Sequence, residues 1–257
     1  MNKLLFVALL ALAYASATEY CRAGLCRPGQ KHVACGASGK MAASCPKNAQ
    51  FLDLSEFKND IVNSHNEKRN QVAGGKIAKH QSAVRMATIQ WDDELAYLAG
   101  LNVKTCNYGH DQCRNTDTFG FAGQNIAKKW WYGKNPEIKT LLLEQINNWF
   151  GEFKDSDMSK INKVARSSSG PATGHFTVMV AELSIRVGCA AVRSSELKNG
   201  YNMETLTTAC NYAHTNVIDH RIYRAGAAAS QCKTGKNPQY PFLCSVNESY
   251  DPNTPLK

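Results

Sequence analysis

The spacing of apolar residues predicts two helices in the first half of the chain. One begins at Asp53, with Glu56 three residues later in the arrangement of a capping box, and it closes before Gly74. Its apolar positions recur every three or four residues, as one buried helix face requires. A second helix with the same periodicity runs from Asp92 to Cys106. The apolar positions of the first helix are Leu54, Phe57, Ile61 and Val62, with His65 on the same side as a packing residue.

The broadest apolar face belongs to a third predicted helix. Asn135 caps it, and Pro136 occupies the first turn, where a missing backbone donor costs nothing. The face continues to Phe153, and Glu152 lies at its edge, three residues after Trp149. We therefore expect Glu152 to lie beside a large buried helix surface.

Alternating apolar and polar residues predict three strands after this helix, over 175–183, 185–193 and about 203–212. The first has Phe176, Val178 and Val180 on one side. Helices before and between antiparallel strands are typical of an α+β fold in which helices cover a sheet.

The first residues have the pattern of a secretory signal peptide. Lys3 supplies a positive start, residues 4–12 are apolar, and Ala15-Ser16-Ala17 is a small-residue cleavage site. The apolar run is shorter than the ~20 residues that a membrane helix needs, and no second such run follows. The pattern predicts a signal peptide over 1–17 and a secreted, extracellular chain that does not span a membrane.

All ten cysteines lie after this segment, and their number is even. With export into an oxidising space and no closely spaced cysteine pair of the C-x-x-C type, they favour five disulfides. A zinc cluster is the alternative. Four cysteines lie in a loop-rich arm over 18–50, and Cys232 and Cys244 enclose a turn-rich extension over 225–257. The domain between them is expected over 51–224.

The formal net charge is +9, from 30 basic and 21 acidic residues. This excess favours acidic partners such as sulfated glycans, anionic lipid surfaces or acidic proteins. A solvated basic surface without a partner is the alternative. Nucleic acid is not expected as a partner, because a secreted chain without a basic block or a binding motif offers no site for it.

Several short motifs follow one another along the chain. They are His65-Asn66, Trp91-Asp92, Tyr108-Gly109-His110-Asp111, Gly123-Gln124-Asn125-Ile126, Gly174-His175-Phe176-Thr177, Val187-Gly188-Cys189 and Cys210-Asn211-Tyr212. Their content and order resemble the CAP superfamily of cysteine-rich secretory, antigen-5 and pathogenesis-related proteins. The tail Asn237-Pro238-Gln239-Tyr240-Pro241 is similar to the fly and midge branch of antigen-5. The resemblance covers nearly all of residues 20–245.

This resemblance implies a three-layer α-β-α sandwich with a disulfide-stapled arm and a small C-terminal extension, and a monomer is expected. It also implies a protein of venom or saliva that acts as an allergen. The bridges that it implies are Cys21–Cys35, Cys26–Cys113, Cys45–Cys106 and Cys189–Cys210, with Cys232–Cys244 as the pair that remains.

The resemblance also places a family cleft on His110, Gln124, Glu152 and His175. Gln124 stands where the superfamily usually has glutamate, and a neutral amide cannot act as a base, which weakens any mechanism with paired carboxylates. His110, Glu152 and His175 remain as a donor set for Zn²⁺ or Cu²⁺ with an open position. The alternative is a hydrogen-bonded cluster in which Glu152 orients His175 and no ion binds.

Other residues leave two interpretations open. The run Lys128-Lys129-Trp130-Trp131-Tyr132 is either a contact surface for an anionic or lipid ligand, or a set of packed aromatic rings with solvated lysines. Ser167-Ser168-Ser169 precedes His175, but loop serines are usually just solvated. Asn247 begins the only glycosylation sequon and lies in an accessible turn-rich setting.

Three function hypotheses follow. The first is a secreted, non-enzymatic binding protein of venom or saliva that takes a small hydrophobic or host-derived ligand in a cleft walled by the apolar strand at 175–183. The second is a Zn- or Cu-dependent enzyme that uses His110, Glu152 and His175. The third is an immune component of haemolymph. Val178 and Ala181 stand where the superfamily commonly has Gln and Trp, so inherited ligand specificity is not assumed.

Overall fold

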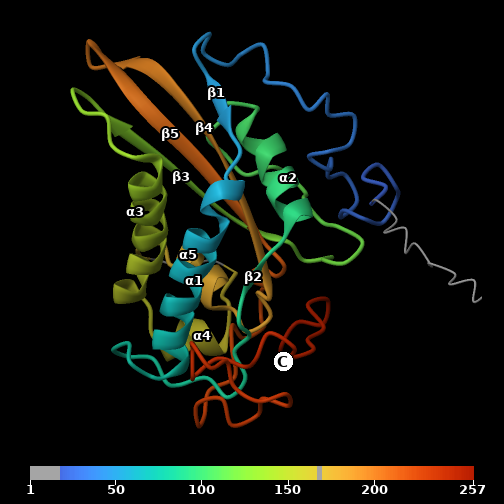
Figure 1. Cartoon of the computed structure of the whole chain (residues 1–257). Helices are drawn as coiled ribbons and strands as arrows, with labels where there is room; N and C mark the ends of the chain where they lie inside the picture. The colour runs from blue at the N-terminus through green and yellow to red at the C-terminus, as the bar shows by residue number, and fades with distance from the viewer. Residues whose placement is uncertain (1–17, 167–169) are drawn as a thin grey trace, which may run out of the picture.

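The computed structural model describes residues 18–166 and 170–257. The predicted signal peptide over 1–17 and the serine run 167–169 lie outside the described residues. The described chain forms three layers, with a twisted sheet between helices, and a loop-rich arm and a C-terminal segment wrap around it (Figure 1).

A five-stranded sheet forms the middle layer, in the order β1-β4-β5-β3. β2 pairs in parallel with the start of β4, while β1 pairs antiparallel with the same strand further along. The turn from β4 to β5 is Asn199-Gly200, and both residues have positive φ, of 53° and 81°. Two such residues are typical of the tightest hairpins. The strands are β1 (Gln50–Leu52), β2 (Gln90–Trp91), β3 (Gly123–Trp131), β4 (Arg186–Lys198) and β5 (Tyr201–Tyr212).

Helices cover both faces of this sheet (Figure 1). α2 (Asp93–Val103) packs on β4 and β5 from one side, over a small apolar core that includes Ala190 and Val192. α1 (Lys58–Ala73), α3 (Ile138–Gly151) and α5 (Gly174–Val180) lie on the other side, over the main core. This arrangement confirms the predicted α-β-α sandwich. Within residues 18–166 and 170–257, the short helices η1 (Ser55–Phe57), η2 (Glu152–Asp155) and α4 (Met158–Asn162) complete the helical content.

Two predicted helix starts differ from the structure. α1 begins at Lys58 after the 3₁₀ turn η1, because Asp53 accepts a hydrogen bond from the Ser55 backbone at 3.0 Å and closes a local turn. α3 begins at Ile138, because the Asn135 side chain accepts a hydrogen bond from Arg193 instead of capping the helix. α2 begins as predicted.

The predicted strand over 175–183 is wrong: its first part is the helix α5. The Glu152 carboxylate accepts hydrogen bonds from the backbone N–H groups of His175 and Phe176, at 2.9 and 3.1 Å, and so caps the helix start. Residues 176–180 are all buried, whichever side of the helix they occupy. Burial on every side gives the sequence no polar face, so alternation could not distinguish strand from helix.

β4 passes very close to the start of α2 at Gly188. A Cβ atom there would lie 2.2 Å from the Ala96 nitrogen and 2.3 Å from the Asp92 oxygen. Only glycine allows this approach. The contact fixes α2 on the sheet and gives a physical reason for the Val187-Gly188-Cys189 motif.

All ten cysteines are paired, as Cys21–Cys35, Cys26–Cys113, Cys45–Cys106, Cys189–Cys210 and Cys232–Cys244. These are the pairs that the family resemblance implies. The arm is fastened to the segment after α2 by two of them, and Leu25 and His32 are among the few arm residues that are buried. The C-terminal segment instead adds Tyr240 and Leu243 to the main core. Of the helices in the described ranges, none has the length and apolarity needed to cross a bilayer.

Candidate functional site

The cleft residues meet at a pocket of about 280 Å³ between the start of β3 and α5, which we call the central pocket. His110, Gln124 and His175 line it together with Arg114 and Asn125. Glu152 lies directly behind His175 and not on the lining. The structure thus brings together the four residues that the resemblance implies, but in two pairs with different surroundings.

Glu152 and His175 form the first pair, which with Asn125 we call the His175 wall. The His175 Nδ1 atom lies 2.6 Å from Glu152 Oε1, while Glu152 Oε2 accepts the two backbone N–H groups at the start of α5. The indole ring of Trp149 stacks on the imidazole at 6.1 Å between centroids. Glu152 therefore stabilises the start of α5 and orients the His175 imidazole, and both of its carboxylate oxygens accept hydrogen bonds from these groups.

A buried chain of hydrogen bonds supports this wall from inside. Asn125 Nδ2 donates to the His175 carbonyl at 3.1 Å and to the Tyr212 hydroxyl at 3.3 Å. The Tyr212 hydroxyl in turn lies 2.9 Å from His65 Nε2, while His65 Nδ1 lies 2.8 Å from the Ile61 carbonyl. Burial lowers the pKa of His65 to about 4 and raises the pKa of Tyr212, so both side chains are neutral at physiological pH. The sequence-based interpretation of His65 as a packing residue agrees with this role.

His110 and Gln124 form the second pair, which with Asp111 and Arg114 we call the His110 wall. Gln124 Nε2 donates to Asp111 Oδ2 at 2.8 Å and to Asn211 Oδ1 at 3.0 Å. Gln124 Oε1 faces His110 Nδ1 at 2.8 Å. Asp111 also forms an ion pair with Arg114 at 2.7 Å. A carboxylate in place of Gln124 would face Asp111, so the neutral amide fits its surroundings.

These contacts determine which nitrogen of each imidazole carries the proton. An ionised carboxylate can only accept hydrogen bonds, so the contact with Glu152 requires a proton on His175 Nδ1. For the same reason the Gln124 amide nitrogen must face Asp111. The Gln124 amide oxygen then faces His110 and accepts a hydrogen bond from Nδ1–H of that imidazole. When either imidazole is neutral, its Nε2 atom therefore keeps a free lone pair. Among the described residues, the buried Oδ1 atoms of Asn125 and Asn216 also lack a hydrogen-bond donor, and both residues line this pocket. The central pocket is rich in acceptors.

A three-residue metal set is not formed here. Within residues 18–166 and 170–257, no three histidine, cysteine or acidic side chains are grouped so that they could hold a metal ion. Glu152 orients His175 through Nδ1, in the way that carboxylates orient histidine ligands in metal sites. Two imidazoles, rather than three ligands, face the central pocket.

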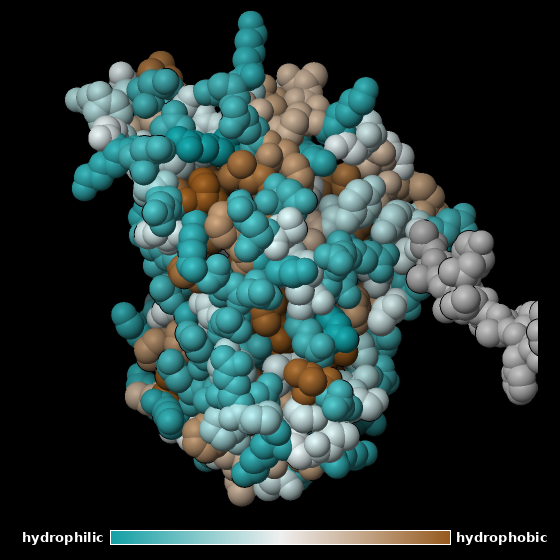
Figure 2. Space-filling view, in the orientation of Figure 1, coloured by the Kyte–Doolittle hydropathy of each residue, from teal (hydrophilic) through white to brown (hydrophobic). Residues whose placement is uncertain are grey.

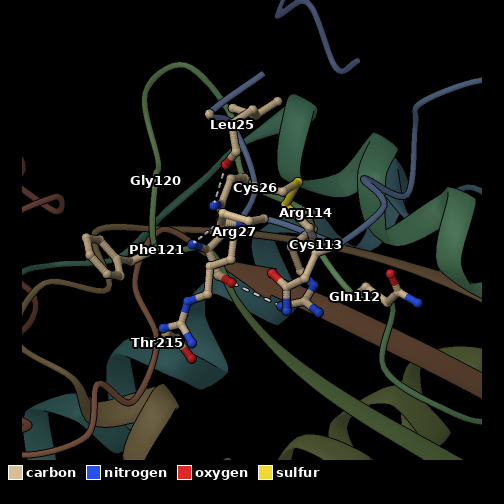
Figure 3. Close-up of a pocket in the computed structure, with 14 residues that line it drawn as sticks. Leu25, Cys26, Arg27, Gln112, Cys113, Arg114, Gly120, Phe121 and Thr215 are labelled. Carbon is tan, nitrogen blue, oxygen red and sulfur yellow. Dashed lines mark hydrogen bonds between the residues drawn. A yellow bond between two sulfur atoms is a disulfide. The ribbon is translucent and has the colours of Figure 1, made fainter. Parts of the chain in front are cut away.

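The central pocket continues into two larger depressions, and we call the three together the groove. Arg114 and Thr215 are shared with a pocket of about 510 Å³ beneath the arm, and Gly174 and Asn216 with a pocket of about 820 Å³ beside α4. Figure 3 shows the first of these, with arm residues 25–27 and the Cys26–Cys113 disulfide on its border. The groove thus runs from the arm, past both histidines, to the segment after α3.

Positive charge lies at both ends of the groove. Arg27 lines the arm end, and Lys160, Lys163 and Arg166 line the other end. Asp219 is the carboxylate on this lining, and it pairs with Lys163 at 3.1 Å. Sequence reasoning missed these cations, because they are brought together from segments that are far apart along the chain.

The apolar strand that we expected to wall the cleft is not formed, and the apolar residues of the groove lining, Val164, Ala165 and Ala172 among them, come from other segments. Phe176 and Val180 are fully buried in the main core, and Val178 is the one apolar residue of the predicted strand that reaches the central pocket, beside His175. The hydrophobic-ligand hypothesis therefore loses the feature on which it depended.

One Ser–His contact exists elsewhere. Ser156 Oγ lies 3.2 Å from His80 Nε2, and His80 Nδ1 lies 2.8 Å from the Ala78 carbonyl. Both side chains are buried, so a substrate could not reach them. His32, His214 and His220 do not line the groove, and each makes a hydrogen bond to a backbone carbonyl.

Comparisons with known proteins agree with this architecture. Residues 62–212 match the model of the cysteine-rich secretory protein (CAP) family. The chain is 40% identical to Venom allergen-1 of Aedes aegypti over 95% of this chain and 93% of that protein. It is also 40% identical to the Antigen 5 like allergen Cul n 1 of Culicoides nubeculosus, over 76% and 93% of the two chains. A solved structure of NaASP2 with Zn²⁺ has the same fold, with a TM-score of 0.60 at 24% identity over 78% of this chain and all of that one.

Proposed function

The chain belongs to the cysteine-rich secretory protein (CAP) family, and from that premise we propose that it is a secreted, non-enzymatic binding protein of venom or saliva. Its ligand is a host-derived sulfated oligosaccharide that lies along the groove. The alternation of cationic ends and an acceptor-rich centre carries this proposal.

The chemistry of the groove matches such a ligand in two ways. Sulfate groups pair with Arg27 at one end and with Lys160 and Lys163 at the other, and charge-assisted hydrogen bonds of this kind are the strong ones. Sugar hydroxyls are donors, and the Nε2 lone pairs of His110 and His175 accept from them in the centre. A purely apolar ligand would leave these polar groups without partners.

A binding role accounts better than catalysis for the state of the cleft residues. Glu152 is engaged by three donors, and Gln124 is neutral, so neither is placed to remove a proton from a substrate. The Ser156–His80 pair is buried away from the groove.

The test is calorimetric titration with a heparin-derived hexasaccharide at about 0.05 M and about 0.3 M NaCl, across which electrostatic screening increases. The account predicts saturable binding with a Kd in the micromolar range, weaker at the higher salt concentration. The variant Arg27→Ser/Lys160→Ser/Lys163→Ser should lose at least about tenfold in affinity, or about 1.4 kcal/mol.

The matched control is Lys40→Ser/Lys58→Ser/Lys236→Ser, which removes the same charge from exposed residues outside the groove lining. It should change affinity by less than about threefold. Equal losses in both variants would mean that only net charge matters and would contradict a groove site. Absence of saturable binding would favour the immune-component hypothesis instead.

A second candidate function is the binding of Zn²⁺ or Cu²⁺ in the central pocket. The residues fit an ion in part: the Nε2 atoms of His110 and His175 would hold it, with Glu152 and Gln124 orienting the two rings through Nδ1. The buried Oδ1 atom of Asn125 offers a further acceptor. A bound ion would supply a positive charge in the middle of the groove.

Metal content after purification and calorimetric titration test this candidate. His175→Ala and His110→Ala should each abolish binding, and affinity should fall in acid because a protonated imidazole does not coordinate. The variant His220→Ala, which changes a histidine outside the groove lining, is the control. Unchanged affinity in both histidine variants would contradict the site.

Secretion, allergenicity and glycosylation belong to the same proposal. The similarity to proteins named as venom and antigen-5 allergens supports the first two. Asn247 is exposed, and its backbone N–H is held by the Ser245 hydroxyl, so the sequon is accessible to modification. Expression in insect cells should yield a leaderless protein in the medium with a glycan that Asn247→Gln removes. Serum IgE from sensitised hosts should bind it.

A further inference from the structure

The end of the sheet opposite the groove extends beyond the helices that cover it. β3 and β5 begin and end beside the central pocket, at Gly123 and Tyr212, and their other ends project past α2 and α3 (Figure 1). There the tight turn Asn199-Gly200 joins β4 to β5. We call residues 130–134 together with 196–202 the hairpin end.

Large apolar side chains of the hairpin end are exposed to solvent. The exposed fractions are 62% for Tyr132, 79% for Leu197 and 57% for Tyr201. Two of them form a ring pair, with Tyr132 and Tyr201 at 5.3 Å between centroids. Figure 2 shows brown surface near the free end of the hairpin, among teal hydrophilic residues. Apolar surface gathered at a protruding end needs a partner to cover it.

These side chains lie on both faces of the hairpin. Leu197 pairs across the strands with Asn202, and Lys198 pairs with Tyr201, so Leu197 and Tyr201 point to opposite sides of the sheet. A protein that docks on one sheet face would leave the other side chain in water. Insertion of the hairpin end into the headgroup region of a bilayer would cover both Leu197 and Tyr201. Their placement on opposite faces therefore favours a lipid interface.

The charge of this region suits an anionic surface. Residues 128–134 and 193–204 contain five cations (Lys128, Lys129, Lys134, Arg193, Lys198) and two carboxylates (Glu196, Glu204). Lys128, Lys129 and Arg193 form ion pairs with Glu196, Glu144 and Glu204, and among the described residues Lys134 and Lys198 form none, so these two cations are available to an anionic surface. Lys198 Nζ lies 3.7 Å from the centre of the Trp130 ring, which keeps the cation at the tip. Tyrosine, tryptophan and lysine together are typical anchors at the boundary between lipid headgroups and acyl chains.

We propose that the hairpin end is a peripheral docking site for anionic phospholipid bilayers. Tyr132, Leu197 and Tyr201 enter the headgroup region, while Lys198 and its neighbours meet lipid phosphates. The tight turn at Asn199-Gly200 presents these side chains at the free end of the sheet. Because the groove lies at the other end of β3 and β5, a docked molecule keeps the groove free. Of the two interpretations of the Lys128–Tyr132 run, packing thus applies to Trp131, which lies in the main core, and the contact surface to Tyr132.

The test is co-sedimentation of the full-length secreted protein with phosphatidylcholine vesicles, with and without phosphatidylserine as a minor component. The account predicts binding to the anionic vesicles that is at least about tenfold tighter than to the neutral ones. Tyr132→Ser/Leu197→Ser/Tyr201→Ser should lower the affinity at least about tenfold, and Lys198→Gln about fivefold, as one cation near an anionic surface warrants. Soluble glycerophosphoserine should not compete, which separates a bilayer from a free headgroup as the ligand.

The matched control is Tyr97→Ser/Tyr108→Ser/Val246→Ser, which removes three comparably exposed apolar residues from other regions. It should bind vesicles like the wild type. Bromine-labelled lipids should quench tryptophan fluorescence, and Trp130→Phe should remove most of that quenching. Binding that the control lowers as much as the hairpin variant, quenching that survives Trp130→Phe, or absence of vesicle binding would each overturn the proposal. Circular dichroism establishes that every variant is folded.

Discussion

The two walls of the central pocket carry one histidine each, and they are built in different ways. The His175 wall belongs to the interior: Glu152 caps α5, and Asn125, Tyr212 and His65 continue the hydrogen bonds into the core. In the His110 wall, Gln124 lies at the start of β3, but His110 and Asp111 belong to a surface segment without a helix or strand, between Cys106 and Cys113, and those two cysteines fasten the segment to the arm.

This difference indicates that the His175 wall mainly stabilises the fold, whereas the His110 wall mainly shapes the pocket. A change in the His175 wall disturbs the fold, because the same carboxylate holds a side chain and a helix start. A change in the His110 wall alters the pocket with a smaller cost, because disulfides and exposed loops hold it. We therefore expect ligand preference to be adjusted on the His110 side.

The largest effect is expected for Glu152→Ala. This change leaves two backbone N–H groups and the His175 Nδ1–H without their acceptor, and hydrogen bonds to charged groups contribute about 1.5–3 kcal/mol each, less than additively. We expect a loss of about 3–4 kcal/mol in the free energy of unfolding, or about 6–15 °C in the melting temperature. Glu144→Ala, on the exposed side of α3, is the control and should cost less than about 1 kcal/mol. Similar melting temperatures for the two variants would remove the distinction between the walls.

Acid should destabilise the His175 wall next most strongly. The pKa of His65 is about 4 in the folded chain and near 6.5 when unfolded, so between these values the unfolded chain binds a proton that the folded chain does not. Stability is then lost as pH falls from about 6.5 to about 4, by up to about 3 kcal/mol in total. Urea unfolding at a series of pH values measures this slope. His65→Gln should flatten it, and an unchanged slope would assign the acid sensitivity to other groups.

An intermediate effect is expected from opening the His110 wall. Cys26→Ser/Cys113→Ser removes one tie between the arm and this segment and should cost about 2 kcal/mol. Hydrogen exchange should rise in residues 104–122 and in the arm, while α5 keeps its protection, since local opening follows local contacts. If exchange rises equally in α5, the two walls form one cooperative unit.

The smallest change in stability is expected for Gln124→Glu. The new carboxylate would face Asp111, at the place where the amide nitrogen now lies 2.8 Å from Asp111 Oδ2, and like charges at this distance should cost about 1–2 kcal/mol. The same carboxylate beside His110 Nδ1 should raise Zn²⁺ affinity about tenfold, because second-shell acceptors strengthen a histidine ligand. Gln239→Glu, at an exposed position away from the groove, is the control. If neither the wild type nor Gln124→Glu binds Zn²⁺, the cluster of His110, Gln124, Glu152 and His175 has a structural role only.

The sequence predicted the layers of the fold better than the site. Motifs such as His65-Asn66 and Val187-Gly188-Cys189 carried the family resemblance, and the α-β-α order followed from it. The α5 error arose because all of residues 176–180 are buried, so periodicity held no information there, and the deciding contact comes from Glu152, more than twenty residues away. The start of α3 was misplaced for the same reason, since Arg193 engages Asn135 from another element.

The sequence could predict which residues form the site, but not how their side chains are arranged. Spacing along the chain could not show that Glu152 lies behind His175, or that Gln124 is held by Asp111. The cations of the groove, Arg27 and Lys163 among them, come from the arm and from the segment after α3, and only the folded chain brings them to one surface. No signal in the local sequence distinguishes them from other basic residues.

Hydrogen–deuterium exchange with and without the heparin-derived hexasaccharide is the most direct test of a ligand that lies along the whole groove. We expect ligand-induced protection in three separate segments, around residues 25–30, 110–115 and 159–166, because the ligand spans the groove. We expect no change within residues 176–180, whose amides the fold already protects. Protection confined to one segment, or located on the opposite end of the sheet, would contradict a continuous binding groove.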